Sequence, residues 1–257
     1  MITYQYLLLL CFVCLNSYAK CKNKINNHSV WKETFNIKTD SLNTQKWSYH
    51  HKSRFLVEAP FDRGYKKFVF TDGDKLHLKA DRVDGQLFLP MVSTLNKYHF
   101  LYGKLSIKAK CPIGKGVWPA IWLVPCKIDS MNYGEIDIQE YIHCFEGKSY
   151  QANVHFVTRQ NGKEIRKMSQ KRIDTDADRW HIYTLEWYPE TIIFKLDEKE
   201  VYRVAKATHE LWPYDQEYYL IFDVLFGGGW GASCGTDNNA LPAEMLVDWV
   251  KYYPLKK

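Results

Sequence analysis

Three carboxylates lie within six residues of a segment that alternates like a β-strand. The acids are Glu135, Asp137 and Glu140. Ile136 and Ile138 directly follow the first two, so acidic and apolar residues alternate. Alternate side chains of a strand share a face, so Glu135 and Asp137 should lie together while Glu140 points the opposite way. Carboxylates this close repel one another, which indicates a functional cluster.

One extra residue in this strand would bring the third acid beside the other two. We therefore expect a β-bulge around Ile138-Gln139. With a rise of about 3.3 Å per residue, the outer Glu carboxyls could then approach to about 5 to 6 Å. That separation is typical of retaining glycosidases, in which one carboxylate attacks a sugar carbon and the other protonates the leaving oxygen. The alternatives are a calcium cluster and a solvated charged strand, although cation sites usually come from loops rich in Asp, Asn and Gly.

The sequence around the acids resembles glycoside hydrolase family 16, in the laminarinase-like branch with a bulged Glu-x-Asp-x-x-Glu signature. The resemblance covers most of the chain after its first residues, and it rests on the order of several motifs. The matching segments are 102–104, 114–123 with its Trp-Pro-Ala-x-Trp pattern, 154–156, 180–187, 227–231 and 247–250.

The resemblance implies a role for each acid. Glu135 is expected to be the nucleophile, Glu140 the general acid and later the general base, and Asp137 the residue that steers the protonation of Glu135. At neutral pH one Glu must be ionised and the other protonated, and repulsion raises the pKa of the less well hydrogen-bonded one. His155 is expected to position groups or tune protonation on the leaving-group side, with a purely structural histidine as the alternative.

Tryptophans are expected to form the floor of a sugar-binding groove. The C–H faces of pyranose rings lie flat on indole surfaces while their hydroxyls hydrogen-bond at the edges. Trp118 and Trp230 fit this role, and Trp122 fits it as well as it fits the core. Trp187 and Trp249 have apolar neighbours in strand-like segments and are expected to be core residues.

Strand-like alternation recurs along the chain, and helical periodicity is nearly absent. We expect one all-β catalytic domain over residues 20–257, with two antiparallel sheets packed as a jelly-roll sandwich. The Glu135 strand would lie in a concave groove that is open at both ends and accepts an internal stretch of polymer. The alternating segments are 75–80, 104–110, 180–187, 192–196, 218–226 and 245–253.

Residues 1–19 have the composition of a secretory signal peptide. They contain no charged residue, and the apolar run 6–14 precedes Ser17-Tyr18-Ala19, a small-x-small pattern that predicts cleavage before Lys20. The apolar run is short for a bilayer, and no later stretch approaches eighteen apolar residues, so we expect no transmembrane segment. The protein is expected to be secreted, periplasmic or at the cell surface, with a lipid anchor at Cys21 as an alternative.

Cysteine content and charge limit other classes. An odd number of cysteines follows the expected cleavage site, so at least one lies outside an intramolecular disulfide, and the sequence fixes no pairing. The net charge of +6 fits a solvated surface and could also favour anionic glycans. We expect a monomer that binds no nucleic acid. The five cysteines are Cys21, Cys111, Cys126, Cys144 and Cys234.

Several residues depart from the family pattern. Asp248 matches the position of a structural calcium ligand, but Thr34 replaces an acid of the N-terminal pattern and puts that calcium in doubt. No cofactor is expected for catalysis. Gln139, His143 and Asp223 replace residues more usual in β-1,3-glucanases, which could mean a different sugar.

The resemblance implies a secreted retaining endo-β-glycanase acting on β-1,3-glucan or mixed-linkage β-glucan. An endo-β-galactosidase acting on keratan, mucin-type glycans or marine galactans is the alternative, because relatives with the same acids cut these substrates and specificity lies in loops. A non-catalytic glucan-binding protein is a further alternative, although such proteins usually lose the acids. Transglycosylation would use the same glycosyl-enzyme, with a sugar instead of water as the attacking group.

Overall fold

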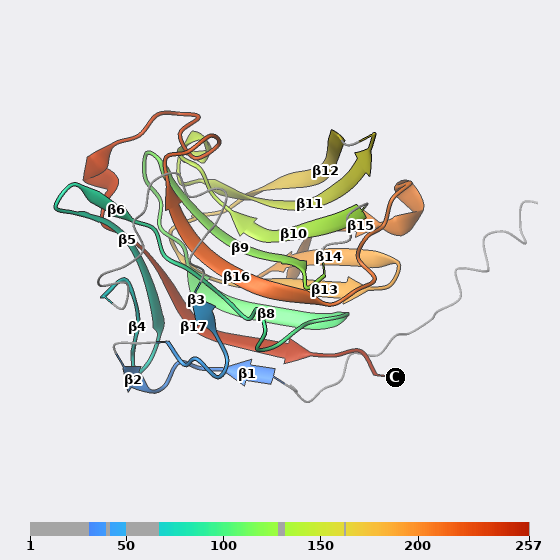
Figure 1. The fold of residues 1–257 in the computed structure, drawn as a ribbon, viewed down its shortest axis with the longest axis horizontal. Helices are drawn as coiled ribbons and strands as arrows, with labels where there is room; N and C mark the ends of the chain where they lie inside the picture. The colour runs from blue at the N-terminus through green and yellow to red at the C-terminus, as the bar shows by residue number, and fades with distance from the viewer. Residues whose placement is uncertain (1–30, 40–41, 50–66, 128–131, 162, 257) are drawn as a thin grey trace, which may run out of the picture.

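The computed structural model describes residues 31–39, 42–49, 67–127, 132–161 and 163–256. The expected signal peptide (1–19) and Cys21 lie outside these residues. Within them the chain forms two antiparallel sheets that pack face to face, which confirms the expected all-β sandwich (Figure 1). No helix in these segments is long and apolar enough to cross a membrane.

The larger sheet has ten strands in the order β15-β14-β13-β8-β17-β5-β4-β2, with β1 on β17 and β6 on β5. Its strands are β1 (Trp31–Glu33), β2 (Lys38–Thr39), β4 (Val69–Asp72), β5 (Leu76–Val83), β6 (Gln86–Phe88), β8 (Gly103–Lys110), β13 (Trp180–Tyr188), β14 (Thr191–Leu196), β15 (Lys199–Ala205) and β17 (Ala243–Tyr253).

The second sheet has seven strands in the order β12-β11-β10-β9-β16-β7-β3. Its strands curve so that the outer face is concave (Figure 1). The strands are β3 (Ser48–Tyr49), β7 (Met91–Ser93), β9 (Val117–Pro125), β10 (Asn132–Glu140), β11 (Ser149–Gln160), β12 (Lys163–Asp174) and β16 (Tyr218–Phe226). Short 3-10 helices η2 (His143–Phe145), η3 (Lys206–Thr208) and η4 (Asn238–Ala240) lie in connections.

The alternation along each strand determines what it buries. On β10, Ile136 and Ile138 point into the core between the sheets and are 0% and 2% exposed, so Glu135 and Asp137, which alternate with them, face outward. Residues of the opposite sheet such as Ile107 and Met245 complete this core. The apolar contact between the sheets thus fixes the face on which the acids are displayed.

The six segments predicted as strands all form strands, but one core prediction was wrong. Trp187 is buried as expected. Trp249 is only partly buried and lies under the ammonium of Lys251, 4.1 Å from its ring centre. The pairing register of β17 shifts between Val247 and Trp249, which reverses the side-chain alternation and turns the indole away from the core.

Candidate active site

An extra residue in β10 places its third acid. Between Asp137 and Glu140, β10 advances three positions while its partner β11 advances two, from Asn153 to Gln151. The β9 side shows a register shift at the same place. This is where the sequence predicted a bulge, and Glu140 lines the same cavity as Glu135 and Asp137.

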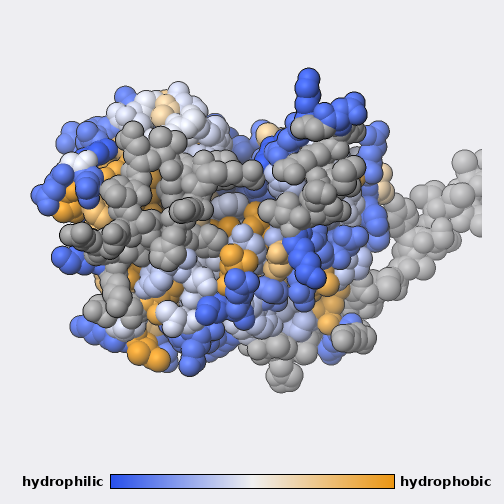
Figure 2. All heavy atoms as spheres, viewed as in Figure 1, coloured by the Kyte–Doolittle hydropathy of each residue, from blue (hydrophilic) through white to orange (hydrophobic). Residues whose placement is uncertain are grey.

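The cavity opens on the concave face of the seven-stranded sheet and has a volume of about 690 Å³. Its walls come from β7, β9, β10, β11, β12 and β16 and from the loop that carries Trp230. The outline of the molecule is hollowed in the same direction, at the top of the view in Figure 2. All four predicted binding residues, Trp118, Trp122, His155 and Trp230, line the cavity with the three acids.

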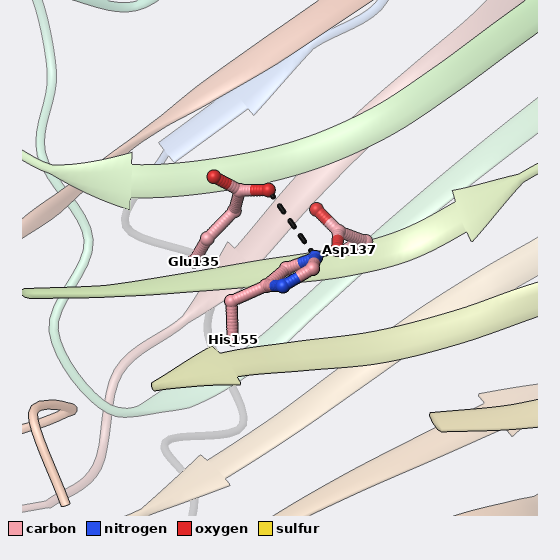
Figure 3. Close-up of side chains that lie close together, drawn as sticks. All are labelled: Glu135, Asp137 and His155. Carbon is pink, nitrogen blue, oxygen red and sulfur yellow. Dashed lines mark ion pairs between the residues drawn. The ribbon is translucent and has the colours of Figure 1, made fainter. Parts of the chain in front are cut away.

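His155 lies beside two of the acids (Figure 3). Its Nε2 is 3.4 Å from Glu135 Oε1 and 3.1 Å from Asp137 Oδ2, and Asn153 Nδ2 lies 2.8 Å away. Burial lowers the pKa of His155, which favours the neutral ring despite the nearby carboxylates. The sequence had placed this ring on the leaving-group side, whereas the structure places it against the expected nucleophile and its neighbour.

Burial and repulsion separate the protonation states of the acids. The pKa of Glu140 is raised well above its ordinary value by burial and by the charges of Asp137 and Glu135. The pKa of Asp137 is also raised, by burial and then by Glu135, against a lowering effect of Arg166. A protonated Glu140 beside a carboxylate is the arrangement that proton donation to a leaving oxygen needs.

The predicted tryptophans contact acids through their indole N–H groups. Trp118 Nε1 donates to Glu140 Oε1 at 3.2 Å, and its ring packs edge-on against Trp230 at a centroid distance of 5.4 Å. Trp122 Nε1 donates to Asp223 Oδ2 at 2.9 Å. Both indoles of β9 are partly exposed in the cavity, so Trp122 belongs to the groove and not to the core.

Sequence reasoning missed Arg166, which enters the site from the neighbouring hairpin. Its Nη1 lies 3.4 Å from Glu135 Oε2, and its Nη2 lies 3.3 Å from the Tyr133 hydroxyl. The register of β11 and β12 pairs Arg166 with Val157. The Asn161-Gly162 dipeptide between alternating segments is the signal that could have indicated this hairpin.

A disulfide joins the two loops beside the acids. Cys144 in η2 is bonded to Cys234, in the loop that also carries Trp230, while Cys111 and Cys126 are free. Phe145 packs edge-on against Trp230 at a centroid distance of 6.0 Å. The disulfide therefore holds an aromatic wall of the cavity in place.

Removing this disulfide should weaken both stability and substrate binding. In Cys144→Ser/Cys234→Ser we expect the free energy of unfolding to fall by about 2–4 kcal/mol, because a long loop is no longer closed in the unfolded chain. KM should rise a few-fold (on the order of threefold) as Trp230 loses its support. Denaturant unfolding and steady-state kinetics measure the two effects. Cys126→Ser is the matched control, and equal behaviour of the two variants would contradict this role.

Asp248 does not fit a calcium ligand. Its Oδ2 lies 2.6 Å from Lys108 Nζ, so an ammonium already neutralises the carboxylate. Calcium prefers six to eight oxygen ligands, and a lysine ammonium in contact with the carboxylate competes with it. The expected calcium therefore has no support at Asp248, and no step of the chemistry depends on it.

The acids should make stability depend on pH. Burial raises the pKa of Asp223 to about 8 from an ordinary value of 3.8, and the pKa values of Asp137 and Glu140 shift in the same direction. A raised folded-state pKa contributes stability that is present below the unfolded value and is lost as pH rises through the folded value. The thermal midpoint should therefore fall between about pH 4 and 8, on the order of 5 °C. Calorimetry should show a smaller fall in Asp223→Asn; a midpoint that rises over this range would contradict the shifts.

Comparison with known proteins gives consistent matches. A sequence model described as glycosyl hydrolases family 16 matches residues 58–251. A beta-glucanase of Rhodothermus marinus is 33% identical over 175 residues, covering 62% of this chain and 60% of the relative. A keratan-sulfate endo-1,4-beta-galactosidase of Sphingobacterium multivorum is 29% identical over 266 residues, covering 93% of this chain and 60% of the relative. The chain thus spans 60% of the length of each of these relatives.

The solved structure of the laminarinase from Rhodothermus marinus superposes with a TM-score of 0.77 at 28% identity, covering 91% of this chain and 99% of the other.

Proposed function

Because the chain belongs to glycosyl hydrolase family 16, we propose that it is a retaining endo-β-glycanase that cleaves internal linkages of β-1,3-glucan or mixed-linkage β-glucan. The observation that carries the proposal is the cavity in which Glu135, Asp137 and Glu140 lie together beside tryptophans. A pure binding protein has no need of such a cluster of mutually repelling acids.

The proposed reaction uses the raised pKa of Glu140 and the presence of Glu135 in the same cavity. The Glu135 carboxylate attacks the anomeric carbon, while the protonated Glu140 gives its proton to the glycosidic oxygen as the bond to the leaving sugar breaks. Glu140, now ionised, then takes a proton from water, whose oxygen attacks the anomeric carbon and releases Glu135. The acetal carbon is inverted twice, so its configuration is retained.

Neighbouring groups orient the nucleophile. His155 and Arg166 lie on opposite oxygens of Glu135, at 3.4 Å from Oε1 and 3.4 Å from Oε2. A carboxylate held at both oxygens loses little freedom when it attacks. Asp137, protonated through its raised pKa, can share its proton with Glu135 as charge on that group changes during the reaction.

The charge of the cavity supports an uncharged sugar chain. Five carboxyl groups line it, and Arg166 is the one Lys or Arg side chain among the described lining residues. Burial raises the pKa of Asp137, Glu140 and Asp223, which favours their neutral forms, and Glu135 and Glu164 both lie beside Arg166. The lining therefore offers sulfate groups no unpaired Lys or Arg among its described residues, which favours neutral glucan over a sulfated glycan. The five carboxyl residues are Glu135, Asp137, Glu140, Glu164 and Asp223.

An endo-β-galactosidase is the second candidate. The relative named for cleavage of keratan sulfate aligns with 93% of this chain, against 62% for the beta-glucanase. Asp223 in the cavity also replaces a residue more usual in β-1,3-glucanases. The same three acids would perform the reaction, and only the sugar contacts would differ.

A polysaccharide panel separates the two candidates. Reducing ends are measured after incubation of the protein with laminarin, barley glucan, agarose, keratan sulfate and mucin glycans. We expect release from laminarin and barley glucan. Activity confined to the galactose-containing polymers would replace the glucanase assignment with the galactosidase, and no release from any polymer would overturn hydrolysis itself.

A further inference from the structure

A further buried acid of the cavity, Asp223 on β16, has no role in the proposed reaction. It is 1% exposed and lines the same cavity as the three acids. Its Oδ2 accepts the Trp122 indole N–H at 2.9 Å. Its Oδ1 is buried and has no hydrogen-bond partner. Half of this carboxyl group thus lacks a hydrogen bond within the protein.

The neighbours of Asp223 leave room for a sugar in front of it. The sheet register places Asp223 opposite Ala120, and Ala120 opposite Glu140. The small side chain of Ala120 lies between those of Trp118 and Trp122 on the same face of β9, and all three line the cavity. Two strand spacings separate Asp223 from Glu140, roughly 10 Å between their backbones. A glycan that lies across the strands over Ala120 would reach both acids.

The chemistry of the free oxygen selects the kind of ligand. An unpaired polar atom in a buried position costs free energy unless a ligand supplies its hydrogen bond. Burial raises the pKa of Asp223 to about 8, so the group is largely neutral at pH 7. A sugar hydroxyl both donates and accepts, so it can pair with Oδ1 in either protonation state.

We propose that Asp223 is a specificity-determining residue whose Oδ1 hydrogen-bonds a hydroxyl of a sugar unit beyond the one at which the bond is cut. Trp122 holds the carboxyl group through its other oxygen, Oδ2. The inference rests on the proposed function, because it requires that a glycan occupy the cavity. It adds a binding position on β16, two strands from Glu140.

The test compares Asp223→Leu and Asp223→Asn with the wild type on β-1,3-glucan oligosaccharides of increasing length and on an activated aryl glycoside. We expect KM of the long oligosaccharides to rise about tenfold or more in Asp223→Leu. The aryl glycoside, too short to reach β16, should keep its kcat/KM within about threefold. Asp223→Asn keeps an acceptor for the Trp122 N–H, so its KM for the long oligosaccharides should lie between those of the wild type and Asp223→Leu.

Thermal unfolding distinguishes binding from support of the fold. Both variants remove a buried, half-satisfied acid, so their midpoints at pH 7 should equal or exceed that of the wild type. The matched control is Glu186→Gln on β13, a buried acid outside the cavity whose Oε1 is 2.5 Å from Lys195 Nζ. That change should lower the midpoint and leave KM unchanged.

Two outcomes would overturn the inference. KM of the long oligosaccharides could be unchanged in Asp223→Leu, or kcat/KM could fall equally for long and short substrates together with the midpoint. Either result leaves the proposed function intact as long as the wild type hydrolyses glucan. A wild type inactive on every glycan would overturn the proposed function and this inference with it.

Discussion

Replacing Glu135 with Ala should abolish hydrolysis, with a fall in kcat on the order of 10⁴-fold or more. The reason is that the change removes the carboxylate that attacks the anomeric carbon in the proposed reaction while Glu140 protonates the leaving oxygen. Reducing-end release from glucan measures the loss. Added azide should restore turnover with an activated aryl glycoside, because it can enter the space left by the carboxylate and give a glycosyl azide of inverted configuration.

A matched replacement separates loss of chemistry from loss of fold. Glu186→Gln also alters a buried glutamate, but it lies on β13 of the other sheet. The turnover of Glu186→Gln should match that of the wild type. Glu135→Ala should keep a cooperative thermal transition like that of the wild type. If Glu135→Ala retained turnover within about tenfold of the wild type, another residue would be the nucleophile.

Replacing Glu140 with Gln should have an effect that depends on the leaving group. Hydrolysis of polysaccharide should fall about 10²- to 10⁴-fold, the usual contribution of a general acid. An activated aryl glycoside needs no protonation on departure, so formation of its glycosyl-enzyme should be much less affected. A burst of released phenol followed by slow turnover is the expected time course, because Glu140 is still missing as the base for water.

The alternative outcome for this variant is equally clear. An equal loss on both substrates, without a burst, would mean that Glu140 does not act as the proton donor. Its raised pKa would then reflect burial next to Asp137 and Glu135 and nothing more.

The site could be predicted from sequence where the chemistry depends on neighbours along one strand. Glu135 and Asp137 share a face through strand periodicity, and the position of Glu140 required one extra residue. The register shift between Asp137 and Glu140 has that effect. Trp118 and Trp230 could be located because their surroundings resemble known motifs. These elements are local, so spacing determines them.

Contacts between distant strands could not be predicted in the same way. Arg166 reaches Glu135 from β12, and the free oxygen of Asp223 depends on the register of β16 against β9. The pairing of Cys144 with Cys234 spans 90 residues and depends on how two loops meet. Trp249 was placed in the core because its neighbours are apolar, and one register shift in β17 reversed that side chain.

The stereochemistry of the first product tests the central claim most directly. Proton NMR recorded within the first minutes of hydrolysis distinguishes the anomers of the new reducing end before they equilibrate. If Glu135 attacks the sugar and Glu140 assists from the same cavity, the β-anomer appears first. Initial appearance of the α-anomer would mean that water attacks directly between two more widely spaced carboxyls, and the assignment of Glu135 as nucleophile would be wrong.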